Sequence, residues 1–388
     1  MLLPDSFDPD RPFPPLTRRL RLGVVGGGRI AQIHAMAARL TGRWEITAGA
    51  FSADSSRAGS AAAEWRLPRC YESYDVMATR EAMLADGIDA VVITTPNHLH
   101  APVARAFLEA GIDVLCEKPM TGDVSQALSL VKLTGKTDRI FVIAYVHSCF
   151  PMIRMARAII AEGGIGAINQ IHAEYIQEWP VTPEARNEPH IEWRLDPARS
   201  GPTSCLADLG THAVHLTEFV SRLPLTHVRA EFHVCVPPKP MEDTVFAWTR
   251  HSAAIPGTLM VTRHAPGNPG GLRLRIFGTE GGLEWALDTC GQLKFSRYGE
   301  ADRIFSKGQG PAETEHPARA PRGFHEGNFG AWATLYTEFA IAVAARRDGF
   351  SLPADSLGMP TVAAGADGMR FIDACVRSNE ADGGWVAI

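Results

Sequence analysis

The chain has 388 residues and a formal net charge of −5, and 45% of its residues are hydrophobic and 21% charged. This length predicts two domains, and the composition excludes a fibrous or disordered protein. The charge disfavours a nucleic-acid partner. Seven scattered cysteines without a C-x-x-C pair disfavour a disulfide framework and a structural zinc site. No apolar run is long enough for a membrane span, so we expect a cytoplasmic protein with no membrane partner.

Residues 1–19 are predicted to form an extended N-terminal arm. Five prolines fall within the first 17 residues, and no apolar periodicity accompanies them. The arm is either a tail without fixed structure or a segment that packs on a partner subunit.

From residue 20 to residue 148, short apolar runs alternate with segments of helical period, which predicts a doubly wound parallel sheet, the Rossmann domain of an α/β protein. The expected strands are RLGVV, EITAGAF, AVVIT, DVLCE and IFVIAYV, and the expected helices are 30–40, 55–65, 102–110 and 124–133.

Residues 149–388 are predicted to form an α+β domain built on a large, mostly antiparallel sheet, for substrate binding and oligomerisation. A helix over 152–162 precedes the alternating strand INQIHAEYIQEW, whose successive side chains face opposite sides of a sheet. A helix over 204–222, further strands through residue 295 and two apolar helices near the C-terminus follow, and we expect the last helix to pack back on the Rossmann domain. The broad sheet face predicts a homodimer or homotetramer.

A glycine-rich loop follows the first strand. Gly26-Gly27-Gly28-Arg29-Ile30-Ala31 fits the G-x-G-x-x-A pattern, in which the backbone turns tightly and a diphosphate lies at a helix N-terminus. Because the loop begins a series of βαβ units, it predicts dinucleotide binding, and the residues expected to contact the cofactor are Gly26, Gly28, Arg29 and Ile30.

The choice between NAD and NADP depends on the end of the second strand. Ser52 stands where an acidic residue that binds the ribose is expected, Asp54 follows two positions later, and Arg57 is a nearby cation. We expect NAD to be favoured, with NADP as the alternative.

Two further strand ends are expected to lie beside the cofactor, because ligands of open α/β sheets bind at the carboxyl edge. One is the stretch Thr94 to His100, in which Thr95, Pro96, Asn97 and His100 are cofactor-binding candidates and helix capping is the alternative for the histidines. The other is Glu117-Lys118-Pro119. A lysine at the end of a buried strand points to function, with a simple ion pair as the alternative.

The helix over 204–222 carries Asp208, His212 and His215 at spacings i, i+4 and i+7, which place them on one helix face. An acid and imidazoles presented together suit proton transfer near neutral pH. Metal binding by His212 and His215 is a weaker alternative, because no matching ligand cluster accompanies them. We therefore expect no metal.

The motifs GVVGGGRIAQIH, TPNHLH, CEKP and SGPTSCLADLGTHAVHL together resemble the glucose-fructose oxidoreductase / inositol dehydrogenase (Gfo/Idh/MocA) family from residue 20 onward. The stretch EWRLDP at 192–197 is most similar to that of inositol and related sugar dehydrogenases. The resemblance implies an NAD(P)-dependent enzyme that oxidises a secondary hydroxyl of a cyclic polyol or sugar. It also implies that Lys118 holds the reacting hydroxyl, His212 removes its proton, and Asp208 binds substrate or orients His212.

Other residues are candidates for binding substrate hydroxyls, namely His190 and Arg194 before the histidine helix and His325 in GFHEGN. Many relatives carry Asp or Asn in place of His215, so its role and the preferred polyol stay open. The alternative activities are those of an aldose 1-dehydrogenase, a 3-keto-glycoside oxidoreductase or a non-catalytic cofactor-binding regulator.

Overall fold

The computed structural model describes residues 16–51, 65–178, 189–236, 241–309, 319–320, 323–352 and 356–388. The described residues form two compact units. Of the described residues, the first unit contains 16–144 together with Trp332–Ala366, and the second contains Tyr145–Ala331 and Asp367–Ile388. The first unit is therefore built from two separate stretches of chain. The predicted N-terminal arm lies outside the described residues up to residue 15.

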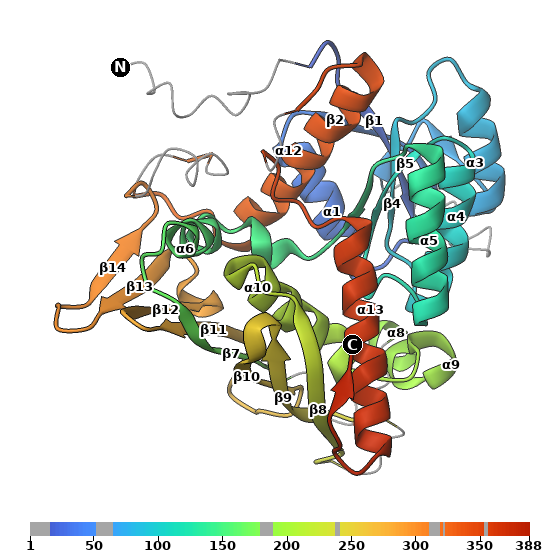
Figure 1. The fold of residues 1–388 in the computed structure, drawn as a ribbon. Coiled ribbons are helices and arrows are strands. Elements are labelled where there is room, and N and C mark those ends of the chain that lie inside the picture. The colour runs from blue at the N-terminus through green and yellow to red at the C-terminus, as the bar shows by residue number, and fades with distance from the viewer. Residues whose placement is uncertain are drawn as a thin grey trace, which may run out of the picture. The chain divides into compact units, whose positions relative to one another are not determined.

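The first unit is built on a six-stranded parallel sheet with the order β3-β2-β1-β4-β5-β6. Helices α3, α4 and α5 cover one face and α1 covers the other (Figure 1). This arrangement confirms the predicted doubly wound Rossmann fold. The elements are β1 (Leu20–Val25), α1 (Arg29–Leu40), β2 (Trp44–Ala50), β3 (Arg69–Cys70), α3 (Tyr74–Met83), β4 (Ala90–Ile93), α4 (His100–Glu109), β5 (Asp113–Cys116), α5 (Val124–Thr137) and β6 (Phe141–Ile143).

Most of helix α12 (Gly327–Asp348) belongs to the first unit, although its residues lie far along the chain. The indole Nε1 of Trp44 donates to the Tyr336 carbonyl at 2.9 Å, and Arg346 pairs with the buried Asp113 at 2.8 Å. Helix α12, which lies within the predicted second domain (149–388), thus packs into the core of the first unit.

The second unit is built on a nine-stranded sheet with the order β14-β13-β12-β11-β7-β10-β9-β8-β15. Among the described strands, β7 and β10 pair in parallel and the other neighbours are antiparallel. The predicted mostly antiparallel sheet is therefore confirmed. The strands are β7 (Ile168–Ile176), β8 (Leu225–His233), β9 (Thr244–His251), β10 (Ile255–Thr262), β11 (Gly271–Gly278), β12 (Gly281–Ala286), β13 (Gln292–Arg297), β14 (Arg303–Ser306) and β15 (Val386–Ala387).

Helices cover one face of this sheet. They include α6 (Pro151–Ala161) and α10 (Thr211–Ser221), which pack on each other and on the strands (Figure 1). The short turns η3 (Val146–Cys149) and η5 (Leu206–Gly210) lead into them, and α8 (Pro189–Glu192), η4 (Trp193–Leu195) and α9 (Pro197–Ser200) come before η5. Most of α13 (Val362–Glu380) also belongs to this unit.

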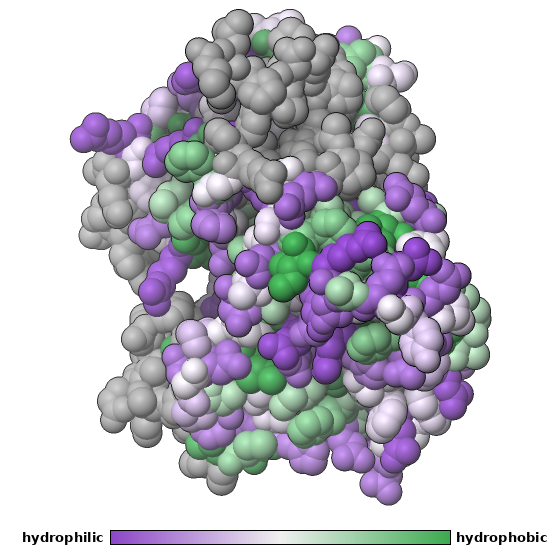
Figure 2. Space-filling view, turned by 90° about the vertical axis from the view of Figure 1, so that its left-hand side faces the viewer, coloured by the Kyte–Doolittle hydropathy of each residue, from purple (hydrophilic) through white to green (hydrophobic). Residues whose placement is uncertain are grey.

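The opposite face of the sheet carries exposed aromatic side chains. Along β9 the burial alternates, so that Val245 and Ala247 are buried while Phe246 and Trp248 are exposed. Figure 2 shows one side of the molecule, on which hydrophobic residues lie between hydrophilic ones. No helix among the described residues is long and apolar enough to cross a membrane.

Candidate functional site

The glycine loop after β1 has the geometry that a diphosphate requires. Gly26 has a positive φ of 97°, and a Cβ there would lie 2.8 Å from the Thr94 backbone, so only glycine fits. Gly28 caps α1, and a Cβ there would meet no atom within 4 Å. The first turn of α1 has no acidic residue and no side-chain cap. The helix N-terminus thus presents backbone N–H groups toward open space, as anion binding requires.

The end of β4 supports this loop. Thr94 Oγ1 donates to the carbonyl oxygens of Val25 and Gly26 at 3.0 and 3.1 Å. Thr95 Oγ1 is buried and has no hydrogen-bond partner among the described residues, as expected of a group that bonds a ligand. Asn97 follows and is buried. These features fit a dinucleotide cofactor.

Both ring nitrogens of His100 contact backbone carbonyl oxygens rather than a ligand. It is buried, and its ring nitrogens lie 2.8 Å from the Pro119 carbonyl oxygen and 2.9 Å from the Thr95 carbonyl oxygen. Burial lowers its pKa, while the hydrogen bonds to the two carbonyls act in the opposite direction. His100 therefore ties the end of β4 to the loop after β5.

Glu117 is held in place from behind by two residues that the sequence interpretation did not single out. His34 on α1 bonds Glu117 Oε1 at 2.9 Å with one ring nitrogen and the Tyr336 hydroxyl at 2.8 Å with the other. Burial alone raises the pKa of Glu117, but the His34 hydrogen bond and the charges of His34 and Lys118 hold it below its usual value. Glu117 also accepts the backbone N–H of Lys118 at 3.1 Å. This bond holds the backbone from which the half-buried Lys118 side chain extends.

Some predicted cofactor and substrate residues cannot be placed. Ser52, Asp54 and Arg57 lie outside the described residues, as do the side chain of His190 and most of the predicted helix 55–65. The choice between NAD and NADP therefore stays a prediction.

In the second unit, Asp208 lies in η5, a π-helical turn, and is held by a buried arginine. Arg263, just beyond β10, donates to Asp208 Oδ2 at 2.6 Å and to the Ser204 hydroxyl at 2.7 Å. Burial alone lowers the pKa of Arg263, but the charge of Asp208 raises it above its usual value. Glu242 accepts the backbone N–H groups of Ser204 and Leu206 at 2.8 and 3.0 Å, which fixes where the turn begins.

His212 lies in the first turn of α10 and contacts a second histidine. Its Nδ1 is 3.2 Å from Nδ1 of His147, which lies in η3. Tyr145 and Tyr175 pack edge-on against the His212 ring, with centroids 5.7 and 6.2 Å away. His212 is thus surrounded by aromatic rings.

His215 lies three positions after His212 on α10 and, like His212, packs against Tyr145; that it shares a polar face with Asp208 stays a prediction. Its ring stacks on Tyr145 at 4.7 Å, and its Nε2 is buried without a partner among the described residues. Burial lowers its pKa to about 3, so it stays neutral at physiological pH. The π-helical turn η5 contains Asp208 and ends before α10, so it changes the angular spacing of Asp208 relative to the two histidines.

The remaining substrate candidates lie at the surface or on the loop before η5. The guanidinium of Arg194 stacks over the Trp193 ring at 4.2 Å, and the Arg194 carbonyl accepts the Ser204 hydroxyl at 2.9 Å. His325 is exposed. Within the described ranges, no group of three or more potential metal ligands occurs.

Sequence reasoning missed Tyr336 and four more polar residues near these sites, namely His34, His147, Glu242 and Arg263. Each of these four had a weak signal, because it is a polar residue next to or within an apolar run. His147 follows the last strand of the parallel sheet, and Arg263 interrupts the run LMVTRHAP. The pairing of His34 with Glu117, of His147 with His212 and of Arg263 with Asp208 is in each case a tertiary contact that no sequence spacing indicates.

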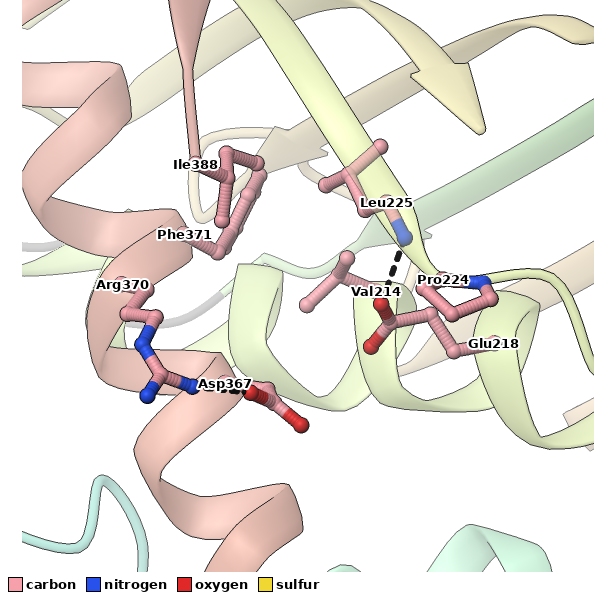
Figure 3. A pocket seen from close by; sticks show the side chains of 8 residues that line it. All are labelled: Val214, Glu218, Pro224, Leu225, Asp367, Arg370, Phe371 and Ile388. Carbon is pink, nitrogen blue, oxygen red and sulfur yellow. Dashed lines mark hydrogen bonds and ion pairs between the residues drawn. The ribbon is translucent and has the colours of Figure 1, made fainter. Parts of the chain in front are cut away.

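A small cavity of about 200 Å³ lies elsewhere on α10. Val214 and Glu218 of α10 and Asp367, Arg370 and Phe371 of α13 line it (Figure 3). Glu218 accepts the Leu225 backbone N–H at 2.7 Å. Burial raises the pKa of Glu218 to about 7, and the charge of Asp367 adds to the shift while the Leu225 bond opposes it.

This shift predicts a pH-dependent stability. A carboxyl whose pKa rises from 4.5 to about 7 on folding binds its proton more tightly in the folded state. The free energy of unfolding therefore falls as pH rises from about 4.5 to about 7. Glu218→Gln keeps an acceptor for Leu225 without a charge and should be more stable than wild type at pH 8, by about 1–3 kcal/mol.

Thermal unfolding at pH 4 and pH 8 measures this effect. The gain should nearly vanish at pH 4, where Glu218 is mostly protonated in both states. Glu380→Gln, at the exposed end of α13, is the matched control and should show no pH-dependent gain. Equal unfolding temperatures for Glu218→Gln and wild type at pH 8 would contradict the assignment.

Models of known protein families match residues of both units. A model described as an oxidoreductase family with an NAD-binding Rossmann fold (GFO_IDH_MocA) matches residues 20–145. The GFO/IDH/MocA C-terminal domain model matches residues 153–284. The chain is 30% identical over 382 residues to YfiI, an uncharacterized oxidoreductase of Bacillus subtilis, covering 96% of this chain and 97% of the relative. The prediction of an NAD-binding domain is confirmed.

Solved structures match over nearly the whole chain. An oxidoreductase from Sinorhizobium meliloti has a TM-score of 0.86 and 36% identity, covering 95% of this chain and 100% of that one. An inositol dehydrogenase homolog from Azotobacter vinelandii, complexed with NAD+, has a TM-score of 0.91 and 30% identity, covering 96% and 98%. The same homolog complexed with NADH and myo-inositol has a TM-score of 0.88.

Proposed function

Because the chain belongs to the Gfo/Idh/MocA family of NAD-binding oxidoreductases, we propose that it oxidises a secondary hydroxyl of a cyclic polyol or sugar to a ketone. The observation that carries this proposal is that Lys118, Asp208 and His212 all stand at the family's motif positions. A non-catalytic regulator would have no need to keep this set. The similarity to an inositol dehydrogenase homolog that binds myo-inositol favours a cyclic polyol.

Each of the three residues has a proposed role. The ammonium of Lys118 binds the reacting hydroxyl and stabilises the negative charge that develops on its oxygen. His212 accepts the hydroxyl proton as general base. NAD held at the glycine loop would supply the acceptor for the hydride from the carbon that carries this hydroxyl.

Asp208 has the proposed role of accepting a hydrogen bond from a second substrate hydroxyl. Its ion pair with the buried Arg263 supports this role, because the pair holds the carboxylate in one orientation. A carboxylate fixed in this way selects substrates with a donor at a defined place. Arg194, His190 and His325 are proposed to complete the substrate contacts.

A substrate screen tests the proposal. Purified enzyme would be assayed with inositol isomers, aldoses and glycosides, with NAD and with NADP, by absorbance at 340 nm. We expect turnover of a cyclic polyol or sugar, with a higher kcat/KM for NAD than for NADP. A lactone product would identify an aldose 1-dehydrogenase and a 3-keto product a glycoside oxidoreductase. Cofactor binding without turnover of any compound would refute the proposed function.

The proposed oligomer is a homodimer or homotetramer formed through the outer face of the nine-stranded sheet. Support comes from an outer patch, which we define as Phe246, Trp248, Met260 and Phe277. Phe246 and Trp248 are 49% and 59% exposed, and Met260 lies opposite Phe246 on the neighbouring strand. Large apolar side chains gathered on one sheet face indicate a covered surface.

We expect Trp248→Lys to lower the oligomeric state, because a charge in a buried apolar interface is costly. Sedimentation equilibrium at micromolar concentration measures the mass. Tyr298→Lys is the control, because Tyr298 is 95% exposed in the turn after β13. A wild-type monomer, or an oligomer that survives Trp248→Lys, would contradict this arrangement.

A further inference from the structure

Two histidines of the second unit meet through their ring nitrogens. Nδ1 of His147 lies 3.2 Å from Nδ1 of His212. The ring centroids are 4.6 Å apart and the planes are nearly perpendicular, at 86°. Phe150 stacks on the His147 ring and Tyr175 meets it edge-on, while Tyr145 and Tyr175 pack against His212. Packing therefore holds both rings in this relation.

This contact couples the protonation of the two rings. A neutral imidazole has one N–H and one lone pair, so one Nδ1 donates and the other accepts. A base that takes a proton at Nε2 needs its lone pair there and its own proton on Nδ1. When His212 has that tautomer, His147 accepts at Nδ1 and carries its proton on Nε2.

We propose that His147 is a positioning residue that holds His212 in the Nδ1–H tautomer and keeps the Nε2 lone pair of His212 ready for the substrate proton. The inference rests on the proposed function, in which His212 is the base. After proton transfer, the Nδ1–H of the imidazolium still donates to His147, so the same bond stabilises the charged form. A third group that orients the base is a recurring feature of proton-transfer sites.

The chemistry of His147 differs from that of the carboxylate usual in this role. A neutral imidazole fixes the tautomer through a directed lone pair and adds no negative charge beside the base. The nearby carboxylate, Asp208, is engaged by Arg263 at 2.6 Å. The two tasks of orienting the base and binding substrate are thereby divided between different residues.

Two substitutions at position 147 separate positioning from packing. His147→Asn places an amide oxygen near the position of Nδ1 and keeps an acceptor, whereas His147→Phe keeps a ring and removes the acceptor. His227→Asn, exposed on β8, is the matched control. Nitrogen-15 histidine NMR at pH 8 reads the tautomer of His212, whose signals are identified by their loss in His212→Ala.

We expect the Nδ1–H tautomer of His212 in wild type and in His147→Asn, and a shift toward the Nε2–H tautomer in His147→Phe. The kcat of His147→Phe should fall roughly 10- to 100-fold, because a buried N–H loses its partner. KM and NAD affinity should change little, and His147→Asn should recover most of kcat. In a His212→Ala background, His147→Phe should cost nothing further, whereas a purely structural loss would lower both backgrounds equally.

An Nε2–H tautomer of His212 in wild type, or an unchanged tautomer in His147→Phe, would overturn the proposal. An equal loss of kcat in His147→Asn and His147→Phe would do the same. The wild-type NMR reading needs no substrate, and it needs no variant other than His212→Ala for its assignment. It therefore decides the tautomer even if no polyol or sugar is oxidised, a result that would refute the proposed function separately.

Discussion

Replacing His212 with Ala is expected to lower kcat for the polyol or sugar substrate by roughly 10²- to 10⁴-fold, the usual contribution of a general base. NAD affinity should stay near that of wild type, because the glycine loop and the end of β4 are untouched. Steady-state kinetics with the best substrate of the screen measures the first effect, and fluorescence titration with NADH measures the second. This variant should therefore bind NAD about as tightly as wild type while its kcat is strongly lowered.

Lys118→Ala should be as damaging, because the ammonium both positions the hydroxyl and stabilises the developing alkoxide. Lys118→Arg should not restore activity, since a planar guanidinium differs from a compact charge. The double variant Lys118→Ala/His212→Ala should lose far less than the product of the single losses, because both groups act on one transition state. Turnover near that of wild type in either single variant would refute the mechanism.

The fold was predictable where patterns are local. The strand around Val24 and the strand around Val92 are buried on both faces, and such runs are typical of parallel sheets. Gly26 and Lys118 were identified because a loop or a charge directly follows a buried strand. Helix α3 was missed, because among its ten residues only Met77, Ala78 and Glu81 are buried, which leaves a weak apolar period.

The second-unit site was less predictable because its contacts depend on irregular backbone and distant partners. Helical spacing placed Asp208, His212 and His215 together, but the π-helical turn η5 interrupts that spacing. His212 and His215 both pack against Tyr145, which lies far earlier in the chain. The partner of Asp208, Arg263, comes from a strand end 55 positions later. Spacing along one helix carries no information about such partners.

Gly28→Ala is expected to weaken NAD binding by at least about 10-fold without unfolding the protein. The φ of Gly28 is −75°, which alanine adopts freely, and a Cβ there would meet no atom of the described residues within 4 Å. The methyl group would instead occupy the space beside the α1 N-terminus where a diphosphate approaches the backbone. NADH titration measures the affinity, and thermal unfolding without cofactor measures the stability.

Gly26→Ala is the matched comparison at the other glycine of the pattern. Its φ of 97° disfavours alanine, and the new Cβ would lie 2.8 Å from the Thr94 backbone. This variant should therefore lose stability without cofactor as well as NAD affinity, whereas Gly28→Ala should lose affinity alone. If Gly28→Ala binds NADH as tightly as wild type, the diphosphate does not approach that residue, and the cofactor must meet the α1 N-terminus in another way.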